Sequence, residues 1–429
     1  MKYENFTYHS YNVTPSGFSY HFSMGKHEFR PEWNCAVPNE LLGDPILEKL
    51  VFLLGMAELV SYWKAACPPI VKVMCGNLTE QEKAWWKKLY RNGLGEFFYI
   101  NKITPTDDFM TIDAAESSCS LQQGELLQRT RELSGCLIPV GGGKDSIVTL
   151  EMLRESIGEN LCYIIGDAKR AYDSAKMAGY SDSQILQVRR SIDPMLLELN
   201  KRGYLNGHTP FSAIVAFSSV LFAYLSGKKY VVLSNESSAN EGNVSGSDIN
   251  HQYSKSFEFE LDFRSYTNTL GTGIEYFSLL RPWNELQITA AFTQYPQYFP
   301  IFQSCNVGTK TNTWCCKCAK CLYVYVMLAA FLEDETLVSI FGENLLQRSD
   351  LSNMLDALAN PEYDKPFECV GTREEVCIAI SMAIMRRRAS LPLLLRKYSE
   401  RSALLGFSAG ENALPKDFKI IFEKFSKNA

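Results

Sequence analysis

Short apolar runs alternate with helical patterns in the middle of the chain. Four compact apolar runs are candidate strands: residues 137–140, 161–166, 184–189 and 229–234. Such runs are typical of parallel strands that are buried on both faces of a sheet. Helical stretches lie between them, including residues 211–226, which end at Gly227. Right-handed crossovers between these elements predict an α/β fold with a doubly wound, mostly parallel sheet.

The first hundred residues follow a different pattern. Residues 5–37 alternate aromatic and polar side chains, and turn signals at Pro15-Ser16-Gly17 and Gly25-Lys26 predict a small antiparallel meander. A helix, a strand and a second helix are expected next, over residues 41–66, 70–74 and 79–93. The second helix opens on Thr79 and Glu82, which have the spacing of a capping box.

These patterns divide the chain into three predicted domains. Residues 1–105 form an N-terminal α+β domain, residues 125–300 an α/β domain, and residues 301–429 a mostly helical C-terminal segment. Residues 103–124 are polar and aperiodic, which is typical of a linker or an exposed connection. A chain of 429 residues is long enough for two or three domains with cores of their own.

Composition and charge exclude some function classes. The net charge of −5 argues against non-specific nucleic-acid binding, which requires a broad basic surface. The first ten residues lack the apolar stretch of a signal peptide, and the longest apolar segments are too short to span a bilayer. We therefore expect a cytoplasmic protein whose partner is a small molecule, with neither nucleic acid nor membrane as a partner.

The first apolar run of the α/β region leads into a glycine loop. Residues 137–146 read Leu-Ile-Pro-Val-Gly-Gly-Gly-Lys-Asp-Ser, and a helical pattern follows at once. A strand, a glycine loop and a helix N-terminus together present backbone N–H groups to an anion. Lys144 can neutralise charge, Ser146 can cap the helix or bind an oxygen, and Asp145 can position Mg²⁺. A glycine-rich turn without a ligand is the alternative.

The loop resembles the PP-loop, Ser-Gly-Gly-x-Asp-Ser, of ATP pyrophosphatases, which cleave ATP to AMP and pyrophosphate. Gly141 stands here in place of the usual first serine, so one hydroxyl donor is missing. The Walker and Rossmann phosphate motifs do not fit, because Asp145 follows Lys144 and Ser146 replaces the last glycine. The resemblance implies that ATP binds to Gly141, Gly142, Gly143, Lys144, Asp145 and Ser146.

Two polar loops follow later in the chain. Asn206-Gly-His-Thr-Pro210 directly precedes the apolar helix, where a turn and a helix cap would explain it equally well. Residues 234–256 form a long, asparagine-rich stretch, which is unusual in a compact domain unless it is functional. It carries the carboxylates of Glu236 and Glu241, the imidazole of His251 and the ammonium of Lys255. These groups can bind a polar substrate and move a proton; a flexible surface excursion is the alternative.

Four of the 13 cysteines have metal-ligand spacing. Cys305 is followed by Cys315, Cys318 and Cys321, and two C-x-x-C steps suit a tetrahedral Zn²⁺. Four thiolates would close the coordination shell, so the zinc would be structural; free thiols or an iron–sulfur cluster remain alternatives. Cys316 is a spare thiol. Eight other cysteines lie apart and are interpreted mostly as small buried hydrophobes: Cys35, Cys67, Cys75, Cys119, Cys136, Cys162, Cys369 and Cys377.

Several stretches together resemble the ATP-dependent UDP-N-acetylmuramoyl-L-alanyl-L-glutamate epimerases of bacterial cell-wall synthesis. The stretches that carry this resemblance cover most of the chain: 93–99 (Gly-Leu-Gly-Glu-Phe-Phe-Tyr), 140–146, 206–210, 234–243 and 250–255 (Asn-His-Gln-Tyr-Ser-Lys). The resemblance implies that ATP and Mg²⁺ activate a glutamate carboxylate as an acyl-adenylate. A base then removes the acidified Cα proton, an acid returns one to the opposite face, and water releases AMP.

The same resemblance suggests roles for individual residues. His251, Glu236 and Glu241 are the candidates for proton transfer, because general acid–base catalysis needs groups that titrate near neutrality. Phosphates or carboxylates of the substrate would meet basic and amide side chains, for which the candidates are Asn206, His208, Thr209, Asn235, Asn243, Lys255, Arg264 and Arg281. A PP-loop synthase similar to 7-cyano-7-deazaguanine synthase is the nearer alternative, and a nucleotide sensor without turnover is the more distant one.

Overall fold

The structure, a computed structural model, describes residues 3–115, 132–244, 247, 249–399 and 410–427. The strands are β1 (Asn5–Thr14), β2 (Gly17–Met24), β3 (His27–Phe29), β4 (Glu32–Asn34), β5 (Ile70–Asn77), β6 (Thr111–Ala115), β7 (Cys136–Pro139), β8 (Leu161–Ile165), β9 (Ile185–Ser191), β10 (Tyr230–Leu233) and β11 (Glu275–Ser278). The α-helices are α1 (Pro45–Trp63), α2 (Glu80–Gly93), α3 (Gly95–Ile100), α5 (Lys144–Met152), α6 (Lys169–Met177), α7 (Pro194–Lys201), α8 (Phe211–Ser226), α9 (Phe257–Asn268), α10 (Glu285–Thr293), α11 (Ala319–Ala329), α12 (Asp334–Phe341), α13 (Ser352–Ala359), α14 (Arg373–Arg386) and α15 (Lys416–Ser426).

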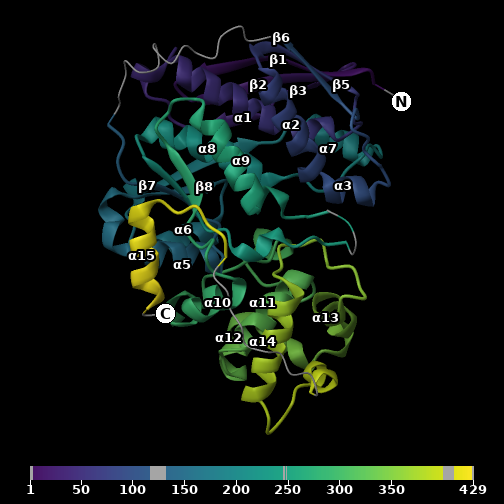
Figure 1. Ribbon diagram of the computed structural model, residues 1–429, viewed down its shortest axis with the longest axis vertical. Coiled ribbons are helices and arrows are strands. Elements are labelled where there is room, and N and C mark those ends of the chain that lie inside the picture. The colour runs from purple at the N-terminus through teal and green to yellow at the C-terminus, as the bar shows by residue number, and fades with distance from the viewer. Residues whose placement is uncertain (1–2, 116–131, 245–246, 248, 400–409, 428–429) are drawn as a thin grey trace.

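One mixed sheet runs through the upper and middle parts of the molecule (Figure 1). Its order is β11-β10-β7-β8-β9-β4-β2-β1-β5-β6, and β3 pairs with β2. Strands β7 to β11 are parallel to one another. The chain moves from β7 outward to β8 and β9, then returns to the other side of β7 for β10 and β11. This is the doubly wound arrangement, and ligands bind where the direction reverses, beyond the carboxyl ends of the strands.

Alternate residues of the parallel strands pack into two separate cores. Leu137 and Val231 face one core, which also contains the apolar sides of α1, α8 and α9. Their neighbours Ile138 and Val232 face the other core, with α5, α6, α10 and α11. Because helices cover both faces, β7, β8 and β10 are continuous apolar runs, whereas β9 also carries Gln187, Arg189 and Arg190. All four confirm the predicted strands.

The N-terminal strands continue the same sheet. Strand β4 pairs antiparallel with β9, so the predicted meander is joined edge to edge to the parallel strands. Helix α1 lies against this junction, where the buried carboxylate of Glu58 accepts hydrogen bonds from Trp33 Nε1 at 2.8 Å and Arg190 Nε at 2.5 Å. The predicted domain boundary near residue 105 therefore stays a prediction. Strands from both sides of that boundary belong to the same sheet.

The other predicted elements have mixed outcomes. Helices α1 and α8 and strand β5 are confirmed, and α2 opens on the predicted capping box of Thr79 and Glu82. The linker prediction for residues 103–124 is wrong in part, because residues 111–115 form edge strand β6, parallel to β5; residues 116–124 lie outside the described part. From residue 301 onward the described residues form helices and turns (lower part of Figure 1), and α15 returns to pack on β10 and β11 through Phe418.

Candidate active site

The glycine loop connects β7 to the N-terminus of α5. Gly142 has a φ of +80°, and a Cβ on it would lie 2.7 Å from the backbone nitrogen of Ala171, so only glycine fits. A Cβ on Gly143 would lie 2.8 Å from Ser304 Oγ. Gly141 has no other atom within 4 Å of such a Cβ, because it faces an open cavity. The loop thus presents bare backbone to a space outside the sheet.

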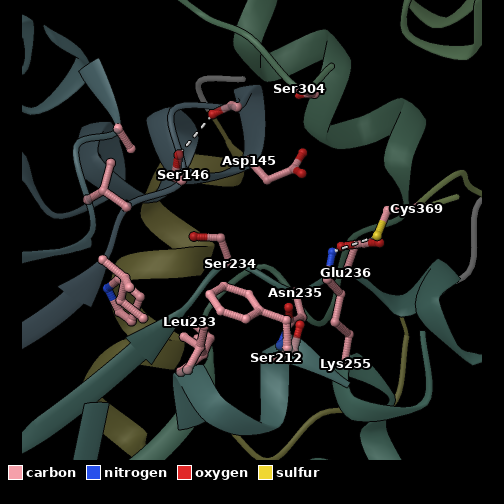
Figure 2. Close-up of a pocket in the computed structure, with 18 of the residues that line it drawn as sticks. Asp145, Ser146, Ser212, Leu233, Ser234, Asn235, Glu236, Lys255, Ser304 and Cys369 are labelled. Carbon is pink, nitrogen blue, oxygen red and sulfur yellow. Dashed lines mark hydrogen bonds between the residues drawn. The ribbon is translucent and has the colours of Figure 1, made fainter. Parts of the chain in front are cut away.

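That cavity lies at the switch point between β7 and β10. Figure 2 shows Asp145 and Ser146 on its α5 side, Ser234, Asn235 and Glu236 after β10, and Lys255 with Cys369 at another wall. Ser146 Oγ donates to Gly143 O at 2.9 Å, which ties the helix start to the loop. The lining residues that the site argument uses are Gly141, Gly143, Asp145, Ser146, Asn235, Glu236, Lys255, Ser304, Lys320 and Cys369.

Lys144 does not face the cavity, which differs from the expectation that it neutralises phosphate directly. Its ammonium group is buried beneath the loop and pairs with Asp145 at 2.5 Å and with Glu285 at the start of α10. These two carboxylates raise the pKa of Lys144 although burial alone would lower it. Lys144 therefore acts as an internal counter-charge for the acidic groups under the loop.

Three carboxylates gather around that lysine. One oxygen from each of Asp145, Glu236 and Glu285 lies within 4.8 Å of the others. Burial raises the pKa of Glu236 and of Glu285, while Lys144 and other lysines outweigh burial and lower that of Asp145. Three carboxylates thus lie around one buried ammonium group, that of Lys144. Oxygen ligands of this kind suit Mg²⁺.

A second cluster joins the long polar loop to three other segments. Lys255 Nζ donates to Cys369 Sγ at 3.2 Å, and His251 also hydrogen-bonds the Cys369 thiol. On its other side the His251 Nδ1 atom is hydrogen-bonded to the carboxylate of Glu96 in α3. The rings of His208 and His251 lie 4.3 Å apart, centroid to centroid. Residues from four distant parts of the sequence thus meet beside the cavity.

The 206–210 loop, which contributes His208 to this cluster, is held by Lys64 of the N-terminal region. Lys64, at the end of α1, donates to Gly207 O, to His208 O at 3.2 Å and to Thr209 Oγ1 at 2.7 Å. Asn206 Oδ1 accepts from the Gly207 N–H at 2.8 Å. Asn206, His208 and Thr209, predicted to bind substrate, are therefore held by α1 and by their own turn, outside the cavity lining.

Two other predicted residues, Arg281 and Asn243, hold the site together. Arg281 is fully buried; it pairs with Glu260 and donates to Glu236 O at 2.5 Å and Lys255 O at 2.8 Å, so it fixes both ends of the polar loop. Asn243 accepts from the His251 N–H and donates to Pro366 O, both at 2.8 Å. Neither side chain lines the cavity. Both were expected to bind substrate, whereas the structure shows them holding the polar loop.

Two further candidates are engaged elsewhere. Glu241 pairs with Lys365 at 3.4 Å and Arg373 at 3.5 Å, away from the cavity lining. Arg264 donates to Ala413 O at 2.6 Å and thereby fastens the segment before α15. Of the three residues predicted to transfer protons, Glu236 lines the cavity, and His251 interacts with Cys369, which also lines it.

The four cysteines with metal-ligand spacing come together next to the glycine loop. The sulfur atoms of Cys305, Cys315, Cys318 and Cys321 all lie within 4.8 Å of one another. Backbone N–H groups approach two of them, Gly308 N at 3.2 Å from Cys305 Sγ and Lys317 N at 3.5 Å from Cys315 Sγ. Cys316 Sγ points instead to Phe341 O, at 3.3 Å. This donor set fits a tetrahedral zinc ion with a closed shell.

The cysteine group also builds one wall of the cavity. Gln303 N donates to Gly142 O at 2.9 Å, and Gln303, Ser304 and Asn306 line the cavity just before and after Cys305.

Among the described residues, no helix is long and apolar enough to cross a bilayer.

Comparisons with known proteins show the family of the chain. A model of the MurL N-terminal domain matches residues 1–279, and a model of the MurL C-terminal domain matches residues 301–407. The chain belongs to the MurL family. It is 34% identical to the UDP-N-acetyl-alpha-D-muramoyl-L-alanyl-L-glutamate epimerase of Xanthomonas oryzae pv. oryzae, over 80% of this chain and 76% of the relative.

Two other relatives carry the same name. The protein of Micromonospora sp. is 35% identical over 78% of this chain and 75% of its own, and that of Salinispora tropica is 35% identical over 78% and 73%. The resemblance inferred from the sequence motifs is thus confirmed at the level of the family.

Three residues of this MurL-family site escaped the sequence analysis. Glu96 lies in the 93–99 stretch that helped to indicate the family, but nothing local marks it as the partner of His251. Glu285 begins α10 after a capping residue, Asn284, which signals a helix start and no more. Cys369 was grouped with the small buried hydrophobes; that interpretation is wrong for it, since its sulfur lies beside Lys255 at the cavity.

Proposed function

We propose that this chain is an ATP-dependent epimerase that inverts the terminal L-glutamate of UDP-MurNAc-L-Ala-L-Glu to D-glutamate, on a fold of the PP-loop ATP pyrophosphatase type. One observation carries the proposal: a single cavity brings the glycine loop and α5 N-terminus together with ionisable side chains suited to proton transfer. The names of the relatives supply the substrate.

ATP would solve a specific chemical problem. A glutamate α-carboxylate is already negative, so removing the Cα proton would create a poorly stabilised dianion. Transfer of AMP to the carboxylate forms an acyl-adenylate and expels pyrophosphate, which removes that charge and acidifies the Cα–H bond. After inversion, water attacks the acyl carbon and releases AMP, which leaves D-glutamate as the terminal residue of UDP-MurNAc-L-Ala-D-Glu.

The residues at the glycine loop would bind the phosphates. Backbone N–H groups at the N-terminus of α5 attract anions, and Gly143 lets phosphate oxygens approach without a side chain in the way. Lys255 and Lys320 both line the cavity and supply positive charge to it. Lys144 holds Asp145 and Glu285 in place from below.

Mg²⁺ fits the group formed by Asp145, Glu236 and Glu285, because one oxygen from each carboxylate lies within 4.8 Å of the others. When bound there, the ion would neutralise charge that develops on the phosphates. The four-cysteine group would hold a structural Zn²⁺ that fixes Gln303 and Ser304 against the glycine loop.

The test follows two products at once. Purified protein is incubated with Mg-ATP and UDP-MurNAc-L-Ala-L-Glu, without any amine, and AMP and the chirality of the terminal glutamate are measured. AMP together with D-glutamate is expected. Ser146→Ala and Asp145→Ala should abolish AMP formation, whereas Asp173→Ala, on the exposed side of α6, should not. Robust AMP formation in either loop variant would contradict the assignment of the loop.

A PP-loop synthase makes the opposite prediction in the same assay. Such an enzyme adenylylates a carboxylate and then needs a nitrogen donor, so AMP would appear only after ammonia and a different carboxylate are supplied. That outcome would move the chain to the synthase class.

A further inference from the structure

Cys369 occupies a fixed position at the cavity. It lies in the segment between α13 and α14, where Lys320 Nζ donates to the Cys369 carbonyl and Gln252 Nε2 donates to Val370 O at 3.1 Å. The first hydrogen bond holds the Cys369 segment against α11, and the second holds it against the polar loop. The thiol lines the same cavity as the glycine loop, as Figure 2 shows.

Positive groups converge on its sulfur. Lys255 Nζ lies 3.2 Å away, His251 forms a hydrogen bond with the thiol, and the Lys320 ammonium is held at the Cys369 backbone. Burial raises the pKa of Cys369, but Lys255, His251 and Lys320 outweigh it and lower the pKa to about 5. The sulfur is therefore a thiolate at neutral pH, and thiolates of this kind are typical of reactive cysteines.

His251 is correspondingly protonated. Burial lowers its pKa, yet the hydrogen bonds with Cys369 and Glu96 prevail and raise it to about 9. An imidazolium cannot take a proton at neutral pH, so His251 is a positioning residue rather than the base. Glu96 holds its ring from the far side, as the third member of a Cys–His–carboxylate set.

The remaining titratable groups that line the cavity, within the described residues, are less suited to deprotonate a carbon. Asp145 is paired with Lys144, and Glu236 belongs to the carboxylate group assigned to Mg²⁺. Lys255 and Lys320 are ammonium groups. Burial raises the pKa of the two tyrosines, Tyr163 and Tyr276, so neither is ionised near neutrality.

We propose that Cys369 is a catalytic residue that exchanges the Cα proton of the activated glutamate on one face, with His251, Glu96 and Lys255 as its positioning residues. This inference rests on the epimerase function proposed above. The Cα–H bond breaks as an S–H bond forms, and the electron pair passes into the acyl group as an enolate. A proton that originates from solvent then adds to the opposite face, and Cys369 returns its own proton to solvent.

The experiment uses the full chain with Mg-ATP and UDP-MurNAc-L-Ala-L-Glu in D₂O. Wild type, Cys369→Ala, Cys369→Ser and the control Cys377→Ser are compared; Cys377 lies in α14, outside the cavity lining. AMP release, deuterium at the glutamate Cα and the D:L ratio are measured. Both Cys369 variants should lose inversion and deuterium incorporation by at least about 100-fold while AMP release continues, and Cys377→Ser should match wild type.

Other outcomes would overturn the assignment. Inversion within tenfold of wild type in Cys369→Ala would exclude the sulfur as a necessary base, and joint loss of AMP and inversion in both folded variants would place Cys369 in substrate binding. A covalent adduct of substrate mass on Cys369 would identify a thioester instead. Wild type that makes neither AMP nor D-glutamate would refute the proposed function itself.

Alkylation of the wild-type chain tests the thiolate without any variant at Cys369. Iodoacetamide should label Cys369 at neutral pH at least about tenfold faster than Cys377, because only the thiolate reacts. His251→Gln should slow this labelling, and the substrate should protect the sulfur. Labelling of Cys369 no faster than that of Cys377 would contradict the proposal.

Discussion

Gly141 and Gly142 are neighbours in the loop after β7, yet an added side chain would meet different surroundings at each. A Cβ at Gly141 projects into open space, and its φ lies outside the left-handed region. At Gly142 the φ is +80° and a Cβ would clash with the Ala171 backbone. Gly142→Ser should destabilise the fold by about 1–3 kcal/mol, whereas Gly141→Ser should fold like wild type and retain AMP formation. Thermal unfolding of the two variants, beside the AMP assay, measures this difference. Equal stability of the two would contradict the loop geometry.

The Cys369–His251 pair predicts how inversion depends on pH. Below about pH 5 the thiol keeps its proton and no base is present; above about pH 9 His251 loses the charge that stabilises the thiolate. The groups that face this pair are Lys255, Lys320, Glu96 and His208. Burial lowers the pKa of His208 to about 3, so His208 stays neutral over this pH range. The kcat/KM for inversion should be bell-shaped, with limbs near these values. Glu96→Gln should move the alkaline limb to lower pH, because it removes a carboxylate that raises the His251 pKa. An unchanged alkaline limb would show that Glu96 does not act on His251.

The residues that the sequence could identify are those in local motifs. The loop at 141–146 is recognisable because strand, glycines and helix start are contiguous, and Glu236 and Lys255 stand in one polar stretch. Cys369 had no such context, since Lys255 is 114 positions away in the chain and the two meet only through the tertiary fold. Arg281 and Asn243 were misinterpreted for a related reason: burial, which decides between binding a ligand and holding a loop, is not visible in a sequence.

At the scale of elements, the joint between β4 and β9 depends on a buried ion pair. Glu58 of α1 accepts from Arg190 at 2.5 and 2.7 Å and from Trp33, and its side chain is fully buried. Glu58→Gln should cost about 3 kcal/mol of unfolding free energy, because it leaves the Arg190 charge uncompensated. Urea denaturation measures this cost. Glu32→Gln makes the same chemical change at an exposed position of β4 and should stay within about 0.5 kcal/mol of wild type. A similar loss in both variants would mean that the pair does not support the joint.

The predicted elements share one property, which is a signal contained within the element. Strands β7, β8 and β10 are continuous apolar runs, α8 ends on a glycine, and α2 starts on a capping box. Strand β6 was missed because five residues with a weak alternation resemble a polar connection. The pairing of β4 with β9 links residues about 160 positions apart, and three-residue strands such as β4 carry no register information of their own. Pairings of this kind follow from tertiary packing alone.

At the scale of the whole molecule, three regions of the chain build one cavity. The glycine loop and the end of β10 come from the parallel sheet, Gln303 and Ser304 from the start of the C-terminal segment, and Cys369 from between its helices. The N-terminal region supplies Glu96 and Lys64, which hold His251 and the 206–210 loop. The site is therefore assembled only when the C-terminal segment is docked on the sheet, and the four-cysteine group lies at that contact.

Metal removal should consequently affect both stability and adenylylation. One zinc ion per chain is expected by elemental analysis, and Cys321→Ser or a chelator should remove it and lower the Tm by several degrees, since a structural zinc stabilises its fold directly. AMP formation should fall in parallel, because Gln303 would no longer be held on Gly142 O. Cys316→Ser is the matched control: this sulfur points to Phe341 O, outside the group, so the zinc content and AMP formation should be retained. If the isolated protein lacks zinc and a chelator changes neither Tm nor AMP formation, the cysteine group does not hold a structural ion. The docking of the C-terminal segment would then rest on the apolar contacts between α10 and α11 and on the return of α15 to the sheet.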